Sequence, residues 1–215
     1  VESERVPMII LNKPTSKSYL SRSDAPSSAA LVNKFFDYGR IASAQLLNDL
    51  ELKNCSVSLP AYICGSLPKF LEDTGYKVNF YDVLDLNHIN LKDIETHVKK
   101  KKPKALFVCH YFGLNISNIQ EIREFADFSN IELIEDYCHS YESFHIEKCN
   151  NRNIKNAVFS FRKTLPFLLG AGYYSQSLSK DANFNNKSLN TTRHAIVEKA
   201  VNRLGWPNIY SDKFK

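Results

Sequence analysis

The segment ALFVCHYFGLNISNIQEIREFADFSNIELIED, residues 105–136, contains two apolar runs joined by a periodic one. Residues 105–109 are continuously apolar, which is typical of a strand buried on both faces. Residues 116–128 place apolar side chains on one side of a helix, and residues 131–134 form a second apolar run. A strand, a helix and a second strand of these lengths predict a βαβ unit with parallel strands.

Comparable patterns flank this unit on both sides. Short apolar runs predict further strands at residues 56–59, 78–83, 157–161 and 170–174. Periodic segments predict further helices, which begin at Gly39 or cover residues 63–74 and 91–98. Repeated alternation of strands and helices predicts an α/β fold, in which a mostly parallel sheet lies between two helical layers.

The length of 215 residues fits one large domain with a shorter appendage. Residues 1–38 are polar and interrupted by prolines, so we expect an irregular N-terminal segment there. Residues 39–175 hold the predicted strands and helices and form the expected large domain. Residues 176–215 are expected to form a Ser- and Asn-rich linker followed by one amphipathic helix over residues 194–204.

The composition is that of a globular protein, since 43% of the residues are hydrophobic and 24% are charged. No run approaches the roughly 18 apolar residues that a membrane helix needs, so no membrane partner is expected. The net charge of +5 equals the contribution of the lysines at positions 99–102 and 104. Such a local run is typical of a cationic helix end, so no nucleic-acid partner is expected either.

The five cysteines are widely spaced and form no CxxC pair. An odd count at wide spacing argues against a disulfide framework and favours a reducing, cytoplasmic location. The two Cys-His dipeptides, at residues 109–110 and 138–139, lack the short paired spacing of zinc ligands, so no metal is expected. With 7 glycines and no GxGxxG motif after a strand, the chain is also a poor match to a nucleotide-binding Rossmann protein.

Polar residues follow several of the predicted strands. His110, Asp136 and Ser160 stand at or just beyond strand ends, and Lys163 follows closely. Ligands of open α/β sheets bind outside the carboxyl ends of the strands, so these residues mark a candidate site. Three of them have an ordinary explanation when taken alone. His110 can be a core histidine, Asp136 a helix cap or ion-pair partner, and Lys163 a solvated lysine.

Four segments in a fixed order extend this argument. They are PAYICGS (60–66), VCHYFG (108–113), LIEDYCHS (133–140) and FSFRKTLP (159–166). Together they resemble the DegT-type (DegT/DnrJ/EryC/StrS) sugar aminotransferases, which are pyridoxal-phosphate enzymes of aminotransferase fold type I. The resemblance runs from about Gly39 to Ser175, the core of that family's large domain. It implies that the small C-terminal domain is largely missing here and that the chain forms a homodimer.

The resemblance assigns the chemical roles to three residues. Lys163 is expected to hold pyridoxal 5'-phosphate as a Schiff base and then to move protons as a general acid–base. Asp136 matches the carboxylate that keeps the pyridine nitrogen protonated, which the ring needs to accept electrons. His139 falls where the family usually has Gln and sometimes His, in position to bond the ring hydroxyl.

Further residues are assigned to cofactor and substrate binding. Ser160 matches the serine that contacts the phosphate, and Arg40 and Ile41 fall on the phosphate loop at a helix N-terminus. Cys64 occupies the position of an aromatic residue that often stacks on the cofactor ring. His110 is expected to contact the substrate.

The leading hypothesis is an aminotransferase that acts on a nucleotide-linked keto-sugar, with glutamate as amino donor, for surface polysaccharide or amino-sugar biosynthesis. Some relatives are dehydratases that replace the lysine by histidine, so Lys163 favours transamination. The alternative is a truncated or degenerate, non-catalytic homologue that acts as an interaction module. Its support is the missing domain, Cys64, and a spacing from Ser160 to Lys163 that is two residues shorter than the family's common pattern.

Overall fold

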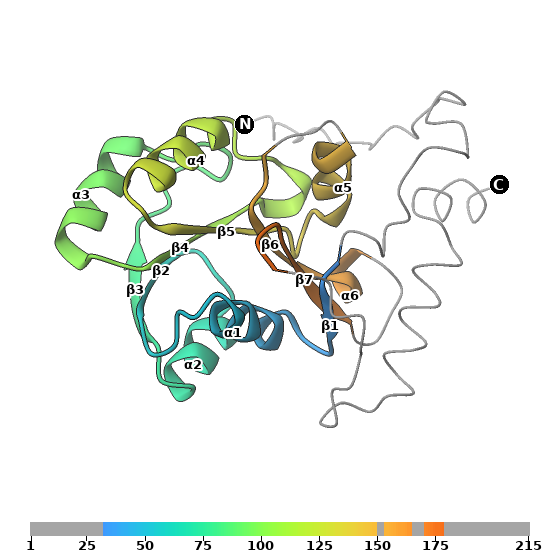
Figure 1. Cartoon of the computed structure of the whole chain (residues 1–215). Helices are drawn as coiled ribbons and strands as arrows, with labels where there is room; N and C mark the ends of the chain where they lie inside the picture. The colour runs from blue at the N-terminus through green and yellow to red at the C-terminus, as the bar shows by residue number, and fades with distance from the viewer. Residues whose placement is uncertain (1–31, 150–152, 165–169, 179–215) are drawn as a thin grey trace, which may run out of the picture.

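The fold is built on one mixed β-sheet with helices on both of its faces (Figure 1). The computed structural model describes residues 32–149, 153–164 and 170–178. Within them the sheet has seven strands in the order β1-β7-β6-β5-β4-β2-β3. The strands are β1 (Lys34–Phe36), β2 (Ser56–Pro60), β3 (Lys77–Tyr81), β4 (Ala105–Cys109), β5 (Glu132–Asp136), β6 (Asn156–Ser160) and β7 (Ala171–Ser175).

The strands from β3 to β6 are parallel to one another, and the other end of the sheet is antiparallel. Strand β2 pairs in parallel with β3 and β4, β4 with β5, and β5 with β6. Strand β7 runs antiparallel to both β6 and β1. The predicted mostly parallel sheet is therefore confirmed, with an antiparallel pair of strands added at one edge.

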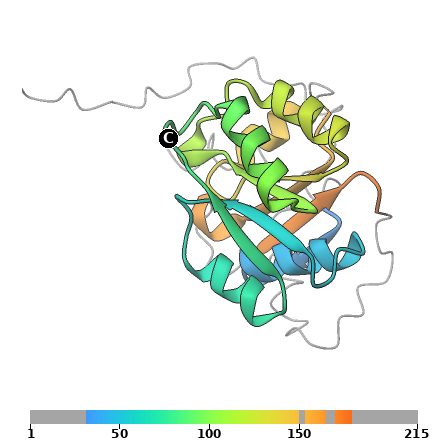
Figure 2. The same ribbon diagram turned by 90° about the vertical axis from the view of Figure 1, so that its left-hand side faces the viewer.

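Helices cover both faces of the sheet, as Figures 1 and 2 show. Helices α1 (Gly39–Asp49) and α2 (Ser66–Asp73) lie on one face. Helices α3 (Leu91–Lys101), α4 (Ile119–Phe128) and α5 (Tyr141–Cys149) lie on the other. The short turns η2 (Tyr111–Gly113) and α6 (Phe161–Thr164) follow β4 and β6. This is the predicted three-layer αβα arrangement.

The lysine run ends a helix, as its position predicts. Lys99–Lys101 occupy the last turn of α3, and Lys102 stops the helix in the left-handed conformation with φ of 49°. At the other end, the Asn90 side chain accepts a hydrogen bond from the Lys92 N–H. Cations near the last carbonyls interact favourably with the helix dipole, so this charge has a local structural explanation.

Two elements depart from the sequence-based expectations. Strand β1 lies inside residues 1–38, which we expected to be irregular, and Phe35 pairs with Gly172 of β7. A three-residue strand is too short to show a period, so only its pairing reveals it. Helix α5 is also absent from the predictions, because its weakly amphipathic sequence gives little signal. Its buried Tyr141 and Phe144 pack against other aromatic rings.

Apolar clusters on both faces fix the sheet between the helices. One joins Leu46 and Leu47 of α1 to Leu59 of β2. A second joins Ile94 of α3 and Ile122 of α4 to buried apolar residues of β3, β4 and β5. A third, mainly aromatic cluster lies beneath α5. Because the strands from β3 to β6 run parallel, their carboxyl ends lie at the same edge of the sheet.

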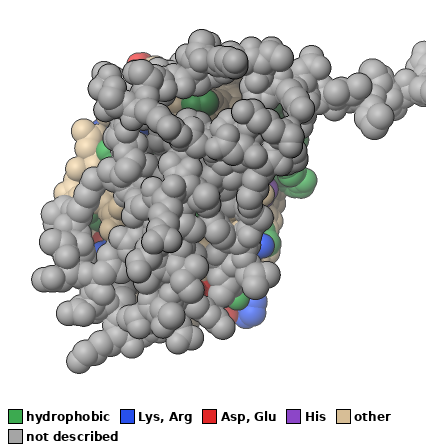
Figure 3. Space-filling view, turned by 90° about the vertical axis from the view of Figure 1, so that its right-hand side faces the viewer, with side chains coloured by type: hydrophobic (Ala, Val, Ile, Leu, Met, Phe, Trp, Pro, Cys, Tyr) green, Lys and Arg blue, Asp and Glu red, His purple; other side chains and the backbone are tan. Residues whose placement is uncertain are grey.

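Some expectations fall on residues 179–215, outside the described part of the chain. They include most of the Ser- and Asn-rich linker and the helix predicted over residues 194–204. Among the described residues, no helix combines the length and hydrophobicity required to cross a bilayer. Along the margin of the face drawn in Figure 3, basic, acidic and hydrophobic side chains all occur.

Candidate active site

A cleft of about 400 Å³ opens at the carboxyl ends of the parallel strands. Its volume is in the range of small-molecule sites. The structure brings seven of the eight predicted site residues to its walls: Arg40, Cys64, His110, Asp136, His139, Ser160 and Lys163. Ile41 is the exception, because its side chain packs against the apolar cluster under α1 and its N–H donates to the Tyr38 carbonyl.

Asp136 is the last residue of β5 and lies beside Cys109 of β4 in the sheet register. Its Oδ1 accepts a 2.8 Å hydrogen bond from the Cys138 N–H, and its Oδ2 lies 3.7 Å from the Cys109 Sγ. Burial, followed by the charge of Asp136, raises the pKa of both thiols. Both cysteines are therefore protonated at neutral pH. The hydrogen bond from the Cys138 N–H fixes the orientation of the Asp136 carboxylate.

Lys163 and His139 meet across the cleft. The Lys163 Nζ lies 2.8 Å from the His139 Nε2. The Phe112 ring stacks on the imidazole with a centroid separation of 5.2 Å and an interplanar angle of 12°. Burial and then the charge of Lys163 lower the pKa of His139, so the imidazole is neutral at neutral pH.

Ser160 presents a buried hydroxyl at the floor of the cleft. Its Oγ has no hydrogen-bond partner among the described residues, although the side chain is buried. The N-terminus of α1 comes close, since a Cβ on Gly39 would lie 3.8 Å from the Ser160 Cβ and 3.2 Å from the Cys138 Sγ. The N–H groups of the first helical residues, Gly39 and Arg40, have no partner within the helix. An orphan hydroxyl beside a helix N-terminus is suited to an anion.

Basic side chains line the cleft that contains this anion site. Arg40, Arg162 and Lys163 line the cleft together with one carboxylate, Asp136. The Arg40 guanidinium lies 4.3 Å from the centroid of the Tyr38 ring, which supports it by a cation–π contact. The residues present therefore fit a phosphate-bearing aromatic cofactor: a hydroxyl and helix N-terminus for the phosphate, a carboxylate, and an amine.

Cys64 lies on the exposed loop between β2 and α2, with its Sγ 3.2 Å from the Ser66 Oγ. Hydrogen bonding to Ser66, with smaller contributions from the charges of Lys163 and Arg162, lowers the pKa of this thiol. The nearest ring on the same loop is Tyr62, which is exposed and packs on Tyr111 at 5.4 Å. At the predicted ring-stacking position the chain thus offers a thiol in place of an aromatic face.

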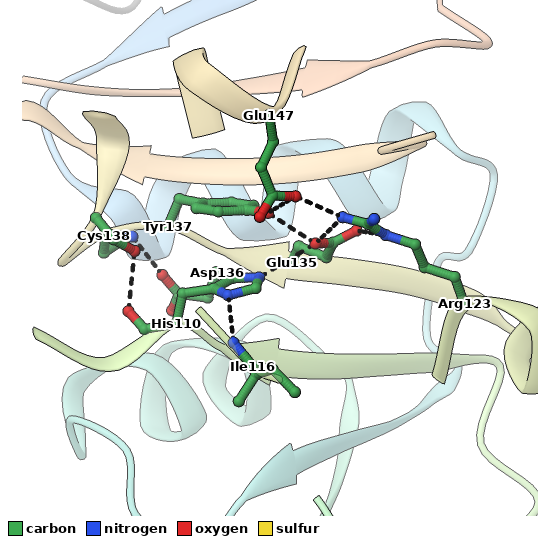
Figure 4. A network of polar contacts seen from close by, with 9 residues as sticks. His110, Ile116, Arg123, Glu135, Asp136, Tyr137, Cys138 and Glu147 are labelled. Atoms are coloured by element: carbon green, nitrogen blue, oxygen red, sulfur yellow. Dashed lines mark hydrogen bonds and ion pairs between the residues drawn. The ribbon is translucent and has the colours of Figure 1, made fainter. Parts of the chain in front are cut away.

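His110 is held inside the protein (Figure 4). Its Nδ1 accepts a hydrogen bond from the Ile116 N–H, so its Nε2 must carry the proton that is donated to Glu135 at 3.1 Å. The ring is 1% exposed and stacks on Tyr137 at 4.0 Å. Both ring nitrogens are occupied, which matches the core histidine of the alternative explanation. A polar contact of His110 to substrate stays a prediction, and it would require one of these bonds to open.

Glu135 joins His110 to a buried ion cluster that was not predicted. Arg123 of α4 donates to both carboxylate oxygens of Glu135, at 2.9 and 2.8 Å, and to Glu147 of α5 at 3.1 Å. Burial raises the pKa of Glu135, but the hydrogen bonds from His110 and Arg123 outweigh it and leave that pKa lowered. Arg123 interrupts the apolar face of α4, and the sequence contains no other signal of its burial.

The sequence profile of the DegT/DnrJ/EryC1/StrS aminotransferase family matches residues 67–202. No curated protein matched the chain. Among solved structures, S. venezuelae DesV in complex with a ketimine intermediate is 18% identical, with a TM-score of 0.55 over 69% of this chain and 42% of that chain.

Two further structures share the fold. NtdA from Bacillus subtilis, with bound cofactor PMP, is 19% identical, with a TM-score of 0.54 over 67% of this chain and 33% of that one. The E. coli GDP-4-keto-6-deoxy-D-mannose-3-dehydratase with bound hydrated PLP is 20% identical, with a TM-score of 0.51 over 66% of this chain and 39% of that one. The chain therefore spans about two fifths or less of the length of these proteins.

Proposed function

Because the chain belongs to the DegT/DnrJ/EryC1/StrS aminotransferase family, we propose that it binds pyridoxal 5'-phosphate and transfers an amino group. One observation carries the proposal. The amine of Lys163, the carboxylate of Asp136 and the buried hydroxyl of Ser160, which has no partner in the described part of the chain, line a single cleft. An amine, an acceptor for a ring N–H and an anion site are the three contacts that this cofactor needs.

Each residue then has a role that its surroundings support. Ser160, Arg40 and the N-terminus of α1 hold the phosphate, and Asp136 keeps the pyridine nitrogen protonated. Lys163 attaches the cofactor through its Nζ and, once displaced, carries a proton at that atom. When bound, the cofactor supplies an electron sink that makes the α-proton of an amine acidic. Cys109 and Cys138, whose pKa values are raised, stay neutral beside Asp136.

The substrate we propose is a nucleotide-linked keto-sugar, with glutamate as amino donor, in surface polysaccharide or amino-sugar biosynthesis. Arg162, a cation of the cleft lining that has no role in binding the cofactor here, supports an anionic substrate. We further propose a cytoplasmic homodimer. A dehydratase, as in the E. coli relative, is the close variant, and the presence of Lys163 favours amination.

A second candidate is a non-catalytic interaction module. It is favoured by Cys64 at the ring-stacking position and by the short spacing from Ser160 to Lys163. The two candidates differ in whether Lys163 forms a covalent adduct with the cofactor.

Peptide mass spectrometry after addition of pyridoxal phosphate and borohydride tests this difference. We expect a reduced adduct on Lys163 in the wild type and none at that position in Lys163→Arg. Lys155→Arg is the matched control, because Lys155 is an exposed lysine paired with Asp127. A folded wild type without an adduct on Lys163 would overturn the aminotransferase and favour the module.

A further inference from the structure

Three side chains from separate segments meet at one wall of the cleft. The Nζ of Lys163, in α6, lies 2.8 Å from the Nε2 of His139, which follows β5. The ring of Phe112, in η2, stacks on the His139 imidazole. The family resemblance directs His139 to the cofactor's ring hydroxyl and says nothing of a contact with Lys163. The contact is therefore a separate property of these residues.

The charge state of the pair follows from its geometry. An ammonium group has only donors, so the His139 Nε2 must be an unprotonated acceptor and the proton must lie on Nδ1. Two charged groups act on His139: Lys163 from α6, which disfavours a second cation, and Asp136 from β5, which favours one. The residue that faces the ring from η2, Phe112, is uncharged.

Phe112 adopts a backbone conformation that needs an explanation. Its φ of 51° and ψ of 32° lie in the left-handed region, which is a strained conformation for a residue other than glycine. The ring gains little from burial, since Phe112 is 62% exposed. Its nearly parallel contact with His139 is the interaction that this conformation provides.

We propose that His139, held in place by Phe112, positions the Lys163 amine in the cleft, and that protonation of His139 releases it. With a protonated imidazole, two cations face each other at hydrogen-bond distance and no acceptor remains. The rate at which Lys163 captures an aldehyde should then change where His139 titrates, and this change should be absent when position 139 holds a group that does not titrate. The contact itself is independent of the proposed function, whereas its effect on capture rests on that function.

An NMR titration of the His139 ring tests the pair without any cofactor. Lys163→Met removes the positive charge, so the pKa of His139 should rise, because neutralising a neighbouring cation favours imidazolium. Lys155→Met, which removes a cation from an exposed pair with Asp127, should leave it unchanged. The His139 signal is assigned by its loss in His139→Gln. An unchanged pKa in Lys163→Met would overturn the proposal.

The rate of the borohydride-trapped adduct tests the consequence. Rates with pyridoxal phosphate are measured between about pH 5 and pH 8 in the wild type and in His139→Gln, whose amide accepts a hydrogen bond but does not titrate. Normalised to the rate at the alkaline end, the wild-type profile should diverge from the His139→Gln profile at the acid end, where His139 becomes protonated. Parallel profiles would overturn the proposal, since a purely structural role lowers all rates equally. A wild type without any adduct would instead overturn the proposed function, and the NMR titration would still decide whether the pair exists.

Discussion

At the scale of single residues, an unpaired buried group is the clearest sign of a ligand. The Ser160 hydroxyl is buried from water and has no hydrogen-bond partner among the described residues. Buried polar groups in native proteins are nearly always paired, so such a group costs stability unless something binds it. Ser58, by contrast, is equally buried and bonds to the His97 Nε2 at 2.8 Å.

This contrast makes a prediction for Ser160→Ala. We expect no loss of stability in the ligand-free protein, because no hydrogen bond is removed. The affinity for pyridoxal phosphate should fall about tenfold or more, since a hydrogen bond to a charged group contributes about 1.5–3 kcal/mol. Urea unfolding and absorbance titration measure the two quantities.

Two controls accompany Ser160→Ala. Pyridoxal, which lacks the phosphate, should bind the variant and the wild type equally well. Ser58→Ala should lose about 1 kcal/mol of stability and keep its affinity for pyridoxal phosphate. An equal loss of affinity for pyridoxal and its phosphate would place Ser160 away from the phosphate.

At the scale of elements, close approach of strands decides which positions tolerate a side chain. Gly172 of β7 lies against β1, where an added Cβ would come within 2.8 Å of the Lys34 carbonyl oxygen and 2.7 Å of a Val32 methyl. A backbone oxygen cannot rotate away, so the strands would have to separate. At Gly65, just before α2, no described atom lies within 4 Å of the same added carbon.

We therefore predict that Gly172→Ala is destabilised by about 1–3 kcal/mol, the usual effect of overpacking. Gly65→Ala should change the free energy of unfolding by less than about 0.5 kcal/mol, as surface substitutions do. Urea unfolding of both variants provides the measurement. Equal stability of the two would mean that β1 does not pair with β7 in solution.

At the scale of the whole molecule, the buried ion cluster ties the sheet to two helices of one layer. Arg123 of α4 bonds to Glu135 of β5 and to Glu147 of α5 (Figure 4). Removing one partner of a buried ion pair is far more costly than replacing the whole pair, because a charge stays behind. The exposed pair of Lys155 and Asp127 has no such penalty.

Arg123→Leu should therefore lose about 3–5 kcal/mol at pH 7, and Lys155→Leu less than about 1 kcal/mol. The pKa of Glu135 decides how this loss of stability changes with pH. In the wild type the pKa of Glu135 lies below its ordinary 4.5, so its contribution is complete above that value and is lost as the pH falls through the folded pKa. Without Arg123, burial raises that pKa, and protonation relieves the buried charge in mild acid.

The cost of Arg123→Leu should thus shrink between pH 7 and pH 5, while the wild type keeps its stability over the same range. Urea unfolding at the two pH values measures the difference. A cost that stays constant with pH would mean that Glu135 is not the charge left unpaired.

The layered architecture follows from local patterns in the sequence. Continuous apolar runs such as residues 105–109 require burial on both faces, and a periodic helix between two such runs requires a parallel connection. The strand-end positions of Asp136 and Ser160 also follow from the sequence. The roles of Lys163 and Cys64 depended on a family resemblance, since nothing in a lone lysine or cysteine marks its function.

Tertiary packing decided which of these groups are available and with what partners. Nothing local indicates that His110 has both nitrogens occupied, that Arg123 is buried, or that Phe112 stacks on His139. These facts depend on residues far apart in the chain, whose distances are set only when the sheet and its helices pack together. Local patterns report on neighbours within a turn or a strand, whereas charge states and accessibility depend on the whole surroundings of a side chain.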